Sequence, residues 1–314
     1  MKKRKIIICA VIALLLLIGF GVWSKWMSTT RIAFINYQTI TLGEIGRAND
    51  NPLVKIESLD AEDMAKAKDY DMVFVQAMGL RLTEDQRAEL EKAMKDGIPV
   101  VSTMITNPDN DFCSVDTAKA NRMKAYIDNG GRKNYHNLLS YVRKYIDKKI
   151  IYASEPEKVV ERVYGLLYHA DPNRPDDENK QFNSLSEYNK FLKEKGLWKP
   201  NAPAIVITGS MGEPKELIAE LEKTGNMVYP VNSIQKFVEE NHADSIKVSA
   251  IINMAHGRVG DAFVDYLKRV DVPLFAPLNV NQLEKKWEND KMGMSGGFLS
   301  QSAVTPEIDG AIPP

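Results

Sequence analysis

Short apolar runs alternate with amphipathic stretches along the chain after residue 30. Runs of four or five residues rich in Val and Ile are typical of strands buried on both faces of a parallel sheet. The clearest run is Ala-Ile-Val-Ile-Thr at residues 204–208. On this pattern we expect strands at residues 32–35, 71–75, 98–101, 204–208, 228–231, 250–252 and 272–276.

Helices are expected between these strands, from the helical spacing of apolar residues and from capping residues. Thr83 and Gln86 form a capping box, and Gly97 ends that helix. Ser184 and Ser233 cap two later helices. Further helices are expected at residues 61–67, 115–128, 134–148, 155–167, 214–223, 259–269 and 282–291, and the tail at 302–314 is expected to be extended.

The alternation of strands and helices predicts an α/β fold with right-handed crossovers. Residues 97–101 and 271–275 each follow a helix in the same way, which indicates two successive parallel-sheet, Rossmann-like lobes with a helical insert. The polar stretch 170–180 contains two prolines and predicts a loop. The expected division is a first lobe with a helical extension at 29–165, a linker with a short helix at 166–202, and a second lobe at 203–314.

The N-terminal segment has the pattern of a membrane anchor. Residues 2–5 are all basic and precede an uninterrupted apolar run at 6–23, close to the length that crosses a bilayer. Trp23 and Trp26 suit the membrane interface, and the basic cluster favours a cytoplasmic start. We expect one transmembrane helix within residues 1–28, in the inner membrane, with the soluble part in the periplasm. A cleaved signal peptide is the alternative.

Composition excludes several classes of protein. The chain has 314 residues, 44% of them hydrophobic and 26% charged, with a formal net charge of -1. This balance implies no broad basic face and gives no electrostatic case for binding nucleic acid. Cys9 and Cys113 are the two cysteines, so neither a disulfide framework nor a cysteine-based metal site is expected.

A glycine loop follows the strand at 204–208 and precedes a helix. Gly209, Ser210 and Gly212 in this loop are candidates for an anion site, because free backbone N–H groups and the positive end of the helix dipole meet there. Glu213 opposes this interpretation, and the loop matches no phosphate-binding motif. A tight turn between strand and helix is the simpler alternative.

His256 and Arg258 follow the strand at 250–252. This position is the carboxyl edge of the sheet, where open α/β folds bind ligands. A neutral imidazole can hold a metal and an arginine can clamp a carboxylate, so His256 is the candidate metal ligand. Ordinary loop chemistry is the alternative for both, and His136 in a helical first turn has the pattern of a surface residue. No catalytic triad or paired-histidine metal spacing occurs.

Four regions of the chain resemble one known family. They are the segment Asn129–Val142, with Gly-Gly followed by Asn-x-x-Asn-Leu-Leu-x-Tyr; Leu167–His169 with Phe182–Tyr188 and Trp198–Pro203; Asp271–Leu274 with Trp287–Glu288; and Thr305–Gly310, with Pro-Glu-x-Asp-Gly. In order and spacing they are similar to the large subunit of cobaltochelatase, CobN, and the related H subunit of magnesium chelatase. The resemblance covers roughly residues 72–314.

The resemblance implies a tetrapyrrole-binding subunit that works with an AAA+ ATPase partner complex. Family members are far longer, so it also implies that the chain is an N-terminal portion, and the end at Pro313-Pro314 agrees with this. One departure concerns the loop at Gly209, where the family often has an aromatic-Arg-x-His stretch. We therefore do not transfer a metal-handling role directly from the family to this loop.

The predicted anchor is a second departure and is similar to the HmuS-type branch of haem-uptake proteins. That branch implies removal of iron from haem, whereas the classical enzymes imply insertion of cobalt into a corrin for cobalamin biosynthesis. For either reaction the resemblance implies contact with metal or propionates by four candidates: Tyr168, His169, His256 and Arg258. The alternative of another class is a membrane-anchored periplasmic module that binds a ligand between two lobes without catalysis.

Overall fold

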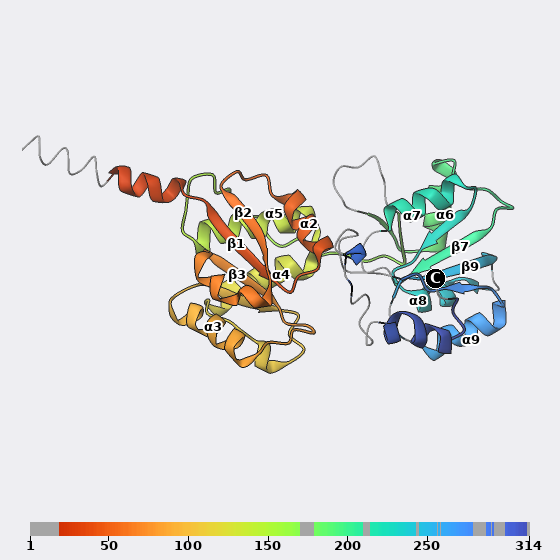
Figure 1. The fold of residues 1–314 in the computed structure, drawn as a ribbon. Helices are drawn as coiled ribbons and strands as arrows, with labels where there is room; N and C mark the ends of the chain where they lie inside the picture. Colours follow the sequence, from red (N-terminus) through yellow and green to blue (C-terminus); the bar gives the residue numbers. More distant parts are fainter. Residues whose placement is uncertain are drawn as a thin grey trace, which may run out of the picture. The chain divides into compact units, whose positions relative to one another are not determined.

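The protein consists of two compact units, Met1–Glu161 and Arg162–Pro314. The structure is a computed structural model that describes residues 19–169, 179–209, 214–242, 245–255, 257, 259–278, 287–289, 291 and 299–312. Each unit carries a four-stranded sheet in which all strands run parallel (Figure 1). The prediction of an α/β fold with two parallel sheets is therefore confirmed.

The transmembrane helix expected at residues 6–23 is not supported, and this corrects the predicted fold class and the inner-membrane localisation. In the part of the chain that the structure describes, no helix is long and apolar enough to cross a membrane. Residues 1–18, which hold most of the expected span, lie outside the described residues. Residues 19–27 are helical.

The sheet of the first unit has the strand order β2-β1-β3-β4. The two central strands are hydrophobic at almost every position and are buried on both faces, as the sequence pattern predicts. The strands are β1 (Thr30–Ile35), β2 (Val54–Leu59), β3 (Met72–Gln76) and β4 (Val100–Thr103). Strand β2 was not expected, because its alternating polar residues carry no run of apolar ones.

Helical elements cover both faces of this sheet. Residues of α2 (Thr39–Ala48), α4 (Thr117–Asn129) and α5 (Gly131–Tyr141) share a core with Phe34 and Phe74, whose rings stack at 5.2 Å. The 3-10 segment η1 (Ala61–Asp69) and α3 (Glu84–Lys95) pack on the other face, against Ile35 and Val75. Helix α3 has the predicted capping box, since Thr83 Oγ1 accepts from Gln86 N and Gln86 Oε1 accepts from Thr83 N.

Two short elements complete the first unit. The 3-10 turn η2 (Pro108–Asn110) follows β4, and the chain then returns beside β4, where Val101 and Cys113 form an antiparallel bridge. Helix α5 continues into the π-helical segment η3 (Val142–Ile146). The helix expected at 134–148 is therefore present, but its second half is wound more loosely than an α-helix.

The prediction of a helix at residues 155–167 is wrong. Residues 153–165 contain no helix, and their backbone groups bond instead to side chains of α5. Asn137 Oδ1 accepts from Glu157 N at 3.0 Å, and Asn134 both accepts from Val160 N at 2.9 Å and donates to Val160 O at 2.8 Å. These asparagines satisfy the backbone of an extended segment, so the segment needs no helical hydrogen bonds.

The second sheet has the order β10-β9-β7-β8. Counted along the chain, both sheets place their strands in the order second, first, third, fourth, which agrees with the expectation of two similar lobes. The strands are β7 (Ala204–Thr208), β8 (Met227–Pro230), β9 (Val248–Asn253) and β10 (Leu274–Phe275). A separate antiparallel pair, β5 (Leu167–His169) and β6 (Lys180–Phe182), is joined to the end of β8 through a Leu167–Val231 bridge.

Helices α6 (Leu185–Glu194), α8 (Ile234–Glu240) and α9 (Asp261–Val270) share one core cluster with Val206 and Ile251. Helix α7 (Lys215–Lys223) packs with Ile207 and Ile252, which point to the opposite face. Ser184 and Ser233 cap α6 and α8 as predicted.

The tail expected to be extended is helical for much of its length. It forms the π-helical segment η5 (Ser300–Val304) and α12 (Thr305–Ile308), in whose first turn Pro306 lies. Proline is well tolerated there, because a first-turn residue has no intrahelical partner for its N–H. Ile312 then pairs in parallel with Phe275 of β10. Most of the helix expected at 282–291 lies outside the described residues.

Candidate functional site

The best-placed site in the second unit is the carboxyl edge of its sheet, between β7 and β9. The chain passes from β7 to β8 on one side, and from β9 to β10 on the other. Open α/β sheets bind ligands at the carboxyl ends of strands where the connections diverge in this way. The sequence placed Gly209, Ser210, Gly212, His256 and Arg258 at this edge.

Two buried polar residues form the floor of this edge. Thr208 ends β7, and Asn253 ends β9 as its pairing partner. They are 5% and 6% exposed. Two hydrogen bonds hold the backbone in place here. Met254 N donates to Thr208 O at 2.8 Å, and Ala255 N donates to Asn253 Oδ1 at 3.1 Å. Sequence reasoning missed both residues, because a single polar residue at the end of an apolar strand gives no motif.

Gly209 directly follows this floor and must be glycine for two reasons. Its φ of +68° lies in the left-handed region, which costs other residues energy. A Cβ at this position would also lie 2.6 Å from both Asn253 Oδ1 and Ala255 Cβ. Gly209 therefore allows the two strand ends to approach closely. Ser210 and Gly212 lie outside the described residues, so the anion-loop hypothesis for them stays a prediction.

His256 and Arg258 also lie outside the described residues, but the residues next to them are placed. Gly257 N donates to Gln301 O at 2.9 Å, and Val259 N donates to Asp309 Oδ2 at 2.8 Å. The C-terminal segment thus lies against the loop that carries both candidates. Asp309 was quoted in the sequence only as part of the Pro-Glu-x-Asp-Gly resemblance, and its contact with this loop could not be read from spacing.

Tyr168 and His169 lie on β5 and are almost fully buried. Tyr168 packs with Ile207 and Ile218 beneath α7. His169 Nε2 lies 3.0 Å from Glu222 Oε1, and its ring meets Phe191 edge to face. These surroundings are those of packing residues.

Two other predicted or visible features can be placed. His136 Nδ1 lies 3.1 Å from the exposed Asp50 carboxylate. An open groove of about 470 Å³ in the second unit is bordered by Tyr164, Lys236 and His242, among others. Within the described ranges, no group of three or more His, Cys, Asp or Glu side chains is arranged to hold a metal ion.

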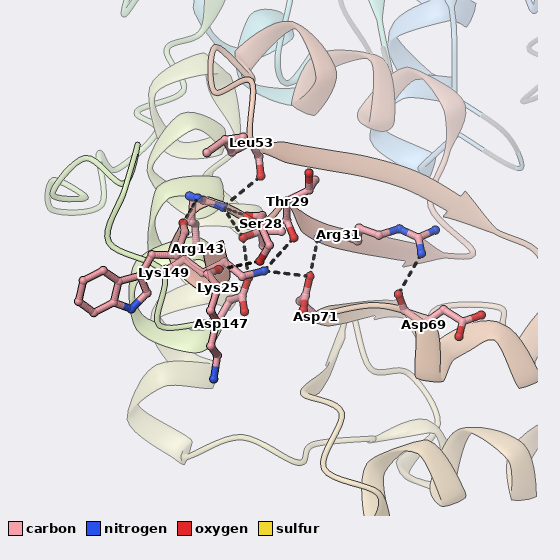
Figure 2. Close-up of polar contacts among 12 residues, drawn as sticks. Lys25, Ser28, Thr29, Arg31, Leu53, Asp69, Asp71, Arg143, Asp147 and Lys149 are labelled. Atoms are coloured by element: carbon pink, nitrogen blue, oxygen red, sulfur yellow. Dashed lines mark hydrogen bonds and ion pairs between the residues drawn. The ribbon is translucent and has the colours of Figure 1, made fainter. Parts of the chain in front are cut away.

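In the first unit, a dense polar cluster lies at the edge of the sheet where its strands begin (Figure 2). Arg143 is completely buried, and its guanidinium donates to the backbone oxygens of Trp26, Ser28, Leu53 and Ile151 at 2.9 to 3.1 Å. Burial lowers the pKa of Arg143, and the nearby carboxylates of Asp147 and Asp71 oppose this shift.

Lys149 extends the same cluster. Its ammonium donates to Thr29 O at 2.8 Å and pairs with Asp147 Oδ2 at 2.7 Å. Thr30 Oγ1 donates to Asp147 Oδ2 at 2.6 Å and accepts from Arg143 at 2.8 Å. The cluster holds the segment that leads into β1, and it lies at the edge of the sheet where such folds do not bind ligands.

A sequence model of the CobN/Magnesium Chelatase family matches residues 124–314, which is more than half of the chain. The chain belongs to the CobN/magnesium chelatase family. The match includes the asparagines of α5, the whole second unit and the loop held by Asp309. No curated protein matches the chain.

One solved structure from a cobaltochelatase is similar to this chain in fold. The catalytic subunit of cobaltochelatase from Mycobacterium tuberculosis matches over 91% of this chain, with 14% identity and a TM-score of 0.51. The chain spans 24% of the length of that subunit. A D-lactate dehydrogenase from Sporolactobacillus is aligned over 90% of this chain and 88% of its own length, at 13% identity and with a TM-score of only 0.29.

Proposed function

We propose that this chain forms part of the large subunit of a metal–tetrapyrrole chelatase and takes part in binding the tetrapyrrole substrate. The observation that carries the proposal is the family match over residues 124–314. The polar floor at the end of β7 and β9 supports it, because it lies at the edge of the sheet where α/β folds bind ligands. The metal ion, iron or cobalt, is a substrate or product of this reaction.

Two reactions fit the proposal. One is removal of iron from haem, as in haem uptake, and the other is insertion of cobalt into a corrin ring. The preference for haem rested on the membrane anchor, which the structure does not support, so it no longer separates the two. The matched structure from Mycobacterium tuberculosis is named as the catalytic subunit of a cobaltochelatase, and cobalt insertion is the second candidate.

Within this proposal, Arg258 and His256 remain the candidates for contact with substrate carboxylates and metal, because they follow β9 in the loop after Asn253. Tyr168 and His169 are assigned no contact with substrate, since both side chains are packed in the core. An AAA+ ATPase complex is the proposed partner, and we expect metal insertion by the complete enzyme to require ATP.

The test is a binding titration with the full chain, using haem, protoporphyrin and hydrogenobyrinic diamide, followed by an assay of released metal. Binding of haem with loss of iron would assign removal, and binding of the corrin without attack on haem would assign cobalt insertion. Binding of a sugar or peptide, with all three macrocycles ignored, would contradict the proposal and support a binding module.

A further inference from the structure

The open groove of the second unit lies between α8 and the segment that leads into β5. One wall is helical, because Lys236, Glu239 and Glu240 have the i, i+3 and i+4 spacing that places side chains on one face of α8. His242, two residues beyond the end of this helix, completes the wall. The volume of the groove is about 470 Å³, which lies within the range of sites for small molecules.

The opposite wall is held in place by hydrogen bonds. Gly165 N donates to Gln181 Oε1 at 3.0 Å. Asn232 donates from Nδ2 to Gly165 O and from its backbone N to Leu166 O, each at 3.0 Å. A Cβ on Gly165 would lie 2.3 Å from Phe182 O, so the close approach at this position requires glycine. The fold itself therefore fixes this wall, and a ligand need not order it.

The turn that carries His242 is also fixed. Asn241, just before it, is buried and bonds twice to Ile246, donating to its O at 3.0 Å and accepting from its N at 2.8 Å. The imidazole of His242 is exposed and has no hydrogen bond or ion pair with any residue that the structure describes. The imidazoles of His136 and His169, by contrast, each lie against a carboxylate. A free neutral imidazole can coordinate a metal ion.

The groove carries charges of both signs. Lys236 is exposed and forms no ion pair with a described residue, although Glu239 and Glu240 lie one turn further along α8. Its ammonium is therefore available to a carboxylate of a ligand. Tyr164 adds an aromatic ring that is 57% exposed. A ligand that complements these groups has a positive centre, negative groups at its rim and an apolar surface.

A metallated tetrapyrrole has this distribution of charge. Its metal ion is positive and accepts an imidazole nitrogen as an axial ligand, while its carboxylates lie on the rim of a flat apolar ring. The same macrocycle without metal has no position for an imidazole ligand, and its carboxylates are repelled by Glu239 and Glu240. The chemistry of the groove therefore favours the form that contains metal.

We propose that this groove binds the metallated tetrapyrrole, with His242 as an axial ligand of the metal and Lys236 paired with a carboxylate of the rim. This inference rests on the proposed function and adds to it a site on elements other than the loop that carries His256. The site distinguishes the macrocycle with metal from the macrocycle without it. In removal of iron it receives the substrate, and in insertion of cobalt it holds the product.

The experiment titrates the full chain with two matched pairs of ligands. They are haemin against protoporphyrin, and the cobalt form of hydrogenobyrinic diamide against the metal-free corrin. Absorbance spectra report both the affinity and the ligation of the metal by imidazole. His242→Ala removes the axial ligand, and His136→Ala, which removes an imidazole of the first unit, is its control. Lys236→Gln removes the contact with the rim, and Lys190→Gln, at an exposed position of α6, is its control.

In wild type, the macrocycle that binds should bind about tenfold or more tightly with metal than without it, and its spectrum should show imidazole ligation. His242→Ala should abolish both the difference and the spectral change, while its circular dichroism stays that of wild type. Lys236→Gln should weaken binding of both members of the pair about twofold to fivefold, as expected for an exposed ion pair. The two control variants should behave as wild type does.

The possible failures are distinct. Equal affinity of wild type for both members of a pair, or a difference that His242→Ala leaves unchanged, would overturn the inference and leave the proposed function standing. Loss of the difference in His256→Ala rather than in His242→Ala would also overturn it, in favour of a metal contact in the loop after β9. Failure of wild type to bind any of the four macrocycles would overturn both proposals.

Discussion

Arg143 shows how one side chain can decide the stability of the first unit. Its side chain is fully buried, and it donates to four backbone oxygens and to Thr30. Arg143→Met removes all five of these hydrogen bonds from a fully buried side chain, at a cost of about 3 kcal/mol or more in the free energy of unfolding. Urea denaturation of the full chain measures this difference.

Lys95 provides the matched control for Arg143. It is an exposed cation in the last turn of α3, and its replacement by Met should change the free energy of unfolding by less than about 0.5 kcal/mol. If Arg143→Met were as mild as Lys95→Met, the cluster would not be the element that holds the start of β1.

Gly209 can be tested against a glycine of almost the same backbone conformation. Gly209 and Gly196 have φ values of +68° and +70°, but a Cβ meets close neighbours only at Gly209, and none within 4 Å at Gly196. Alanine at position 196 should cost about 1 kcal/mol for the backbone alone. Alanine at 209 should cost about 1 to 3 kcal/mol more, because two strand ends must move apart.

The comparison is made on urea unfolding of the full chain, followed by circular dichroism. Equal effects of the two substitutions would mean that the approach of Gly209 to Asn253 is not tight. The sequence shows a glycine directly after the strand, but it could not show why this glycine is needed, because the clash involves a strand that is more than forty residues away.

At the scale of elements, the sequence predicts best where local signals are complete. The strand at 204–208 matches β7 at both ends, since five apolar or β-branched residues lie between a proline and a glycine. The caps of α3, α6 and α8 are correct because each N-cap side chain bonds within its own first turn. Such signals require nothing from distant residues.

The sequence prediction missed elements whose conformation depends on contacts with residues far away in the sequence. Residues 155–167 have helical spacing, yet Asn134 and Asn137 of α5 supply partners for an extended backbone. Strand β2 is polar at alternate positions and is recognisable only beside β1. At the candidate site, the edge of the sheet was predicted, whereas Thr208, Asn253 and Asp309 depend on packing that the sequence alone does not show.

Asn134 offers a test of this explanation. Asn134→Leu removes both bonds to Val160, and we expect the amide of Val160 to exchange with solvent at least tenfold faster, because its hydrogen bond is lost. Hydrogen exchange measured by NMR follows this amide directly. Glu161→Leu, at an exposed position of the same segment, is the control and should leave the exchange of Val160 unchanged.

The outcome separates two explanations of the extended segment. If exchange at Val160 is the same in Asn134→Leu as in wild type, the segment is held by other contacts, such as those that Glu157 O accepts from Arg122 and Tyr126. The asparagine pair would then not be the reason that the helix expected at 155–167 fails to form.

At the scale of the whole molecule, two sheets with the same strand order each have their own hydrophobic core. We therefore expect residues 19–161 to fold without the rest of the chain. Circular dichroism should show a mixed α/β spectrum and a single cooperative thermal transition. A spectrum of an unfolded chain would mean that the core of the first unit is incomplete by itself.

The buried arginine also affects the order of events during synthesis. Thr30 leaves the ribosome with the rest of β1, but Arg143 follows it 113 residues later. At about 5 to 20 residues per second, this delay is roughly 6 to 23 s. During that time the oxygens that Arg143 later binds are hydrated, and Thr30 at the start of β1 lacks its hydrogen bond from Arg143. The contacts of Arg143 with the start of β1 can therefore form only after η3, which follows α5, has been synthesised. We expect a chaperone to act on the first unit mainly during this interval.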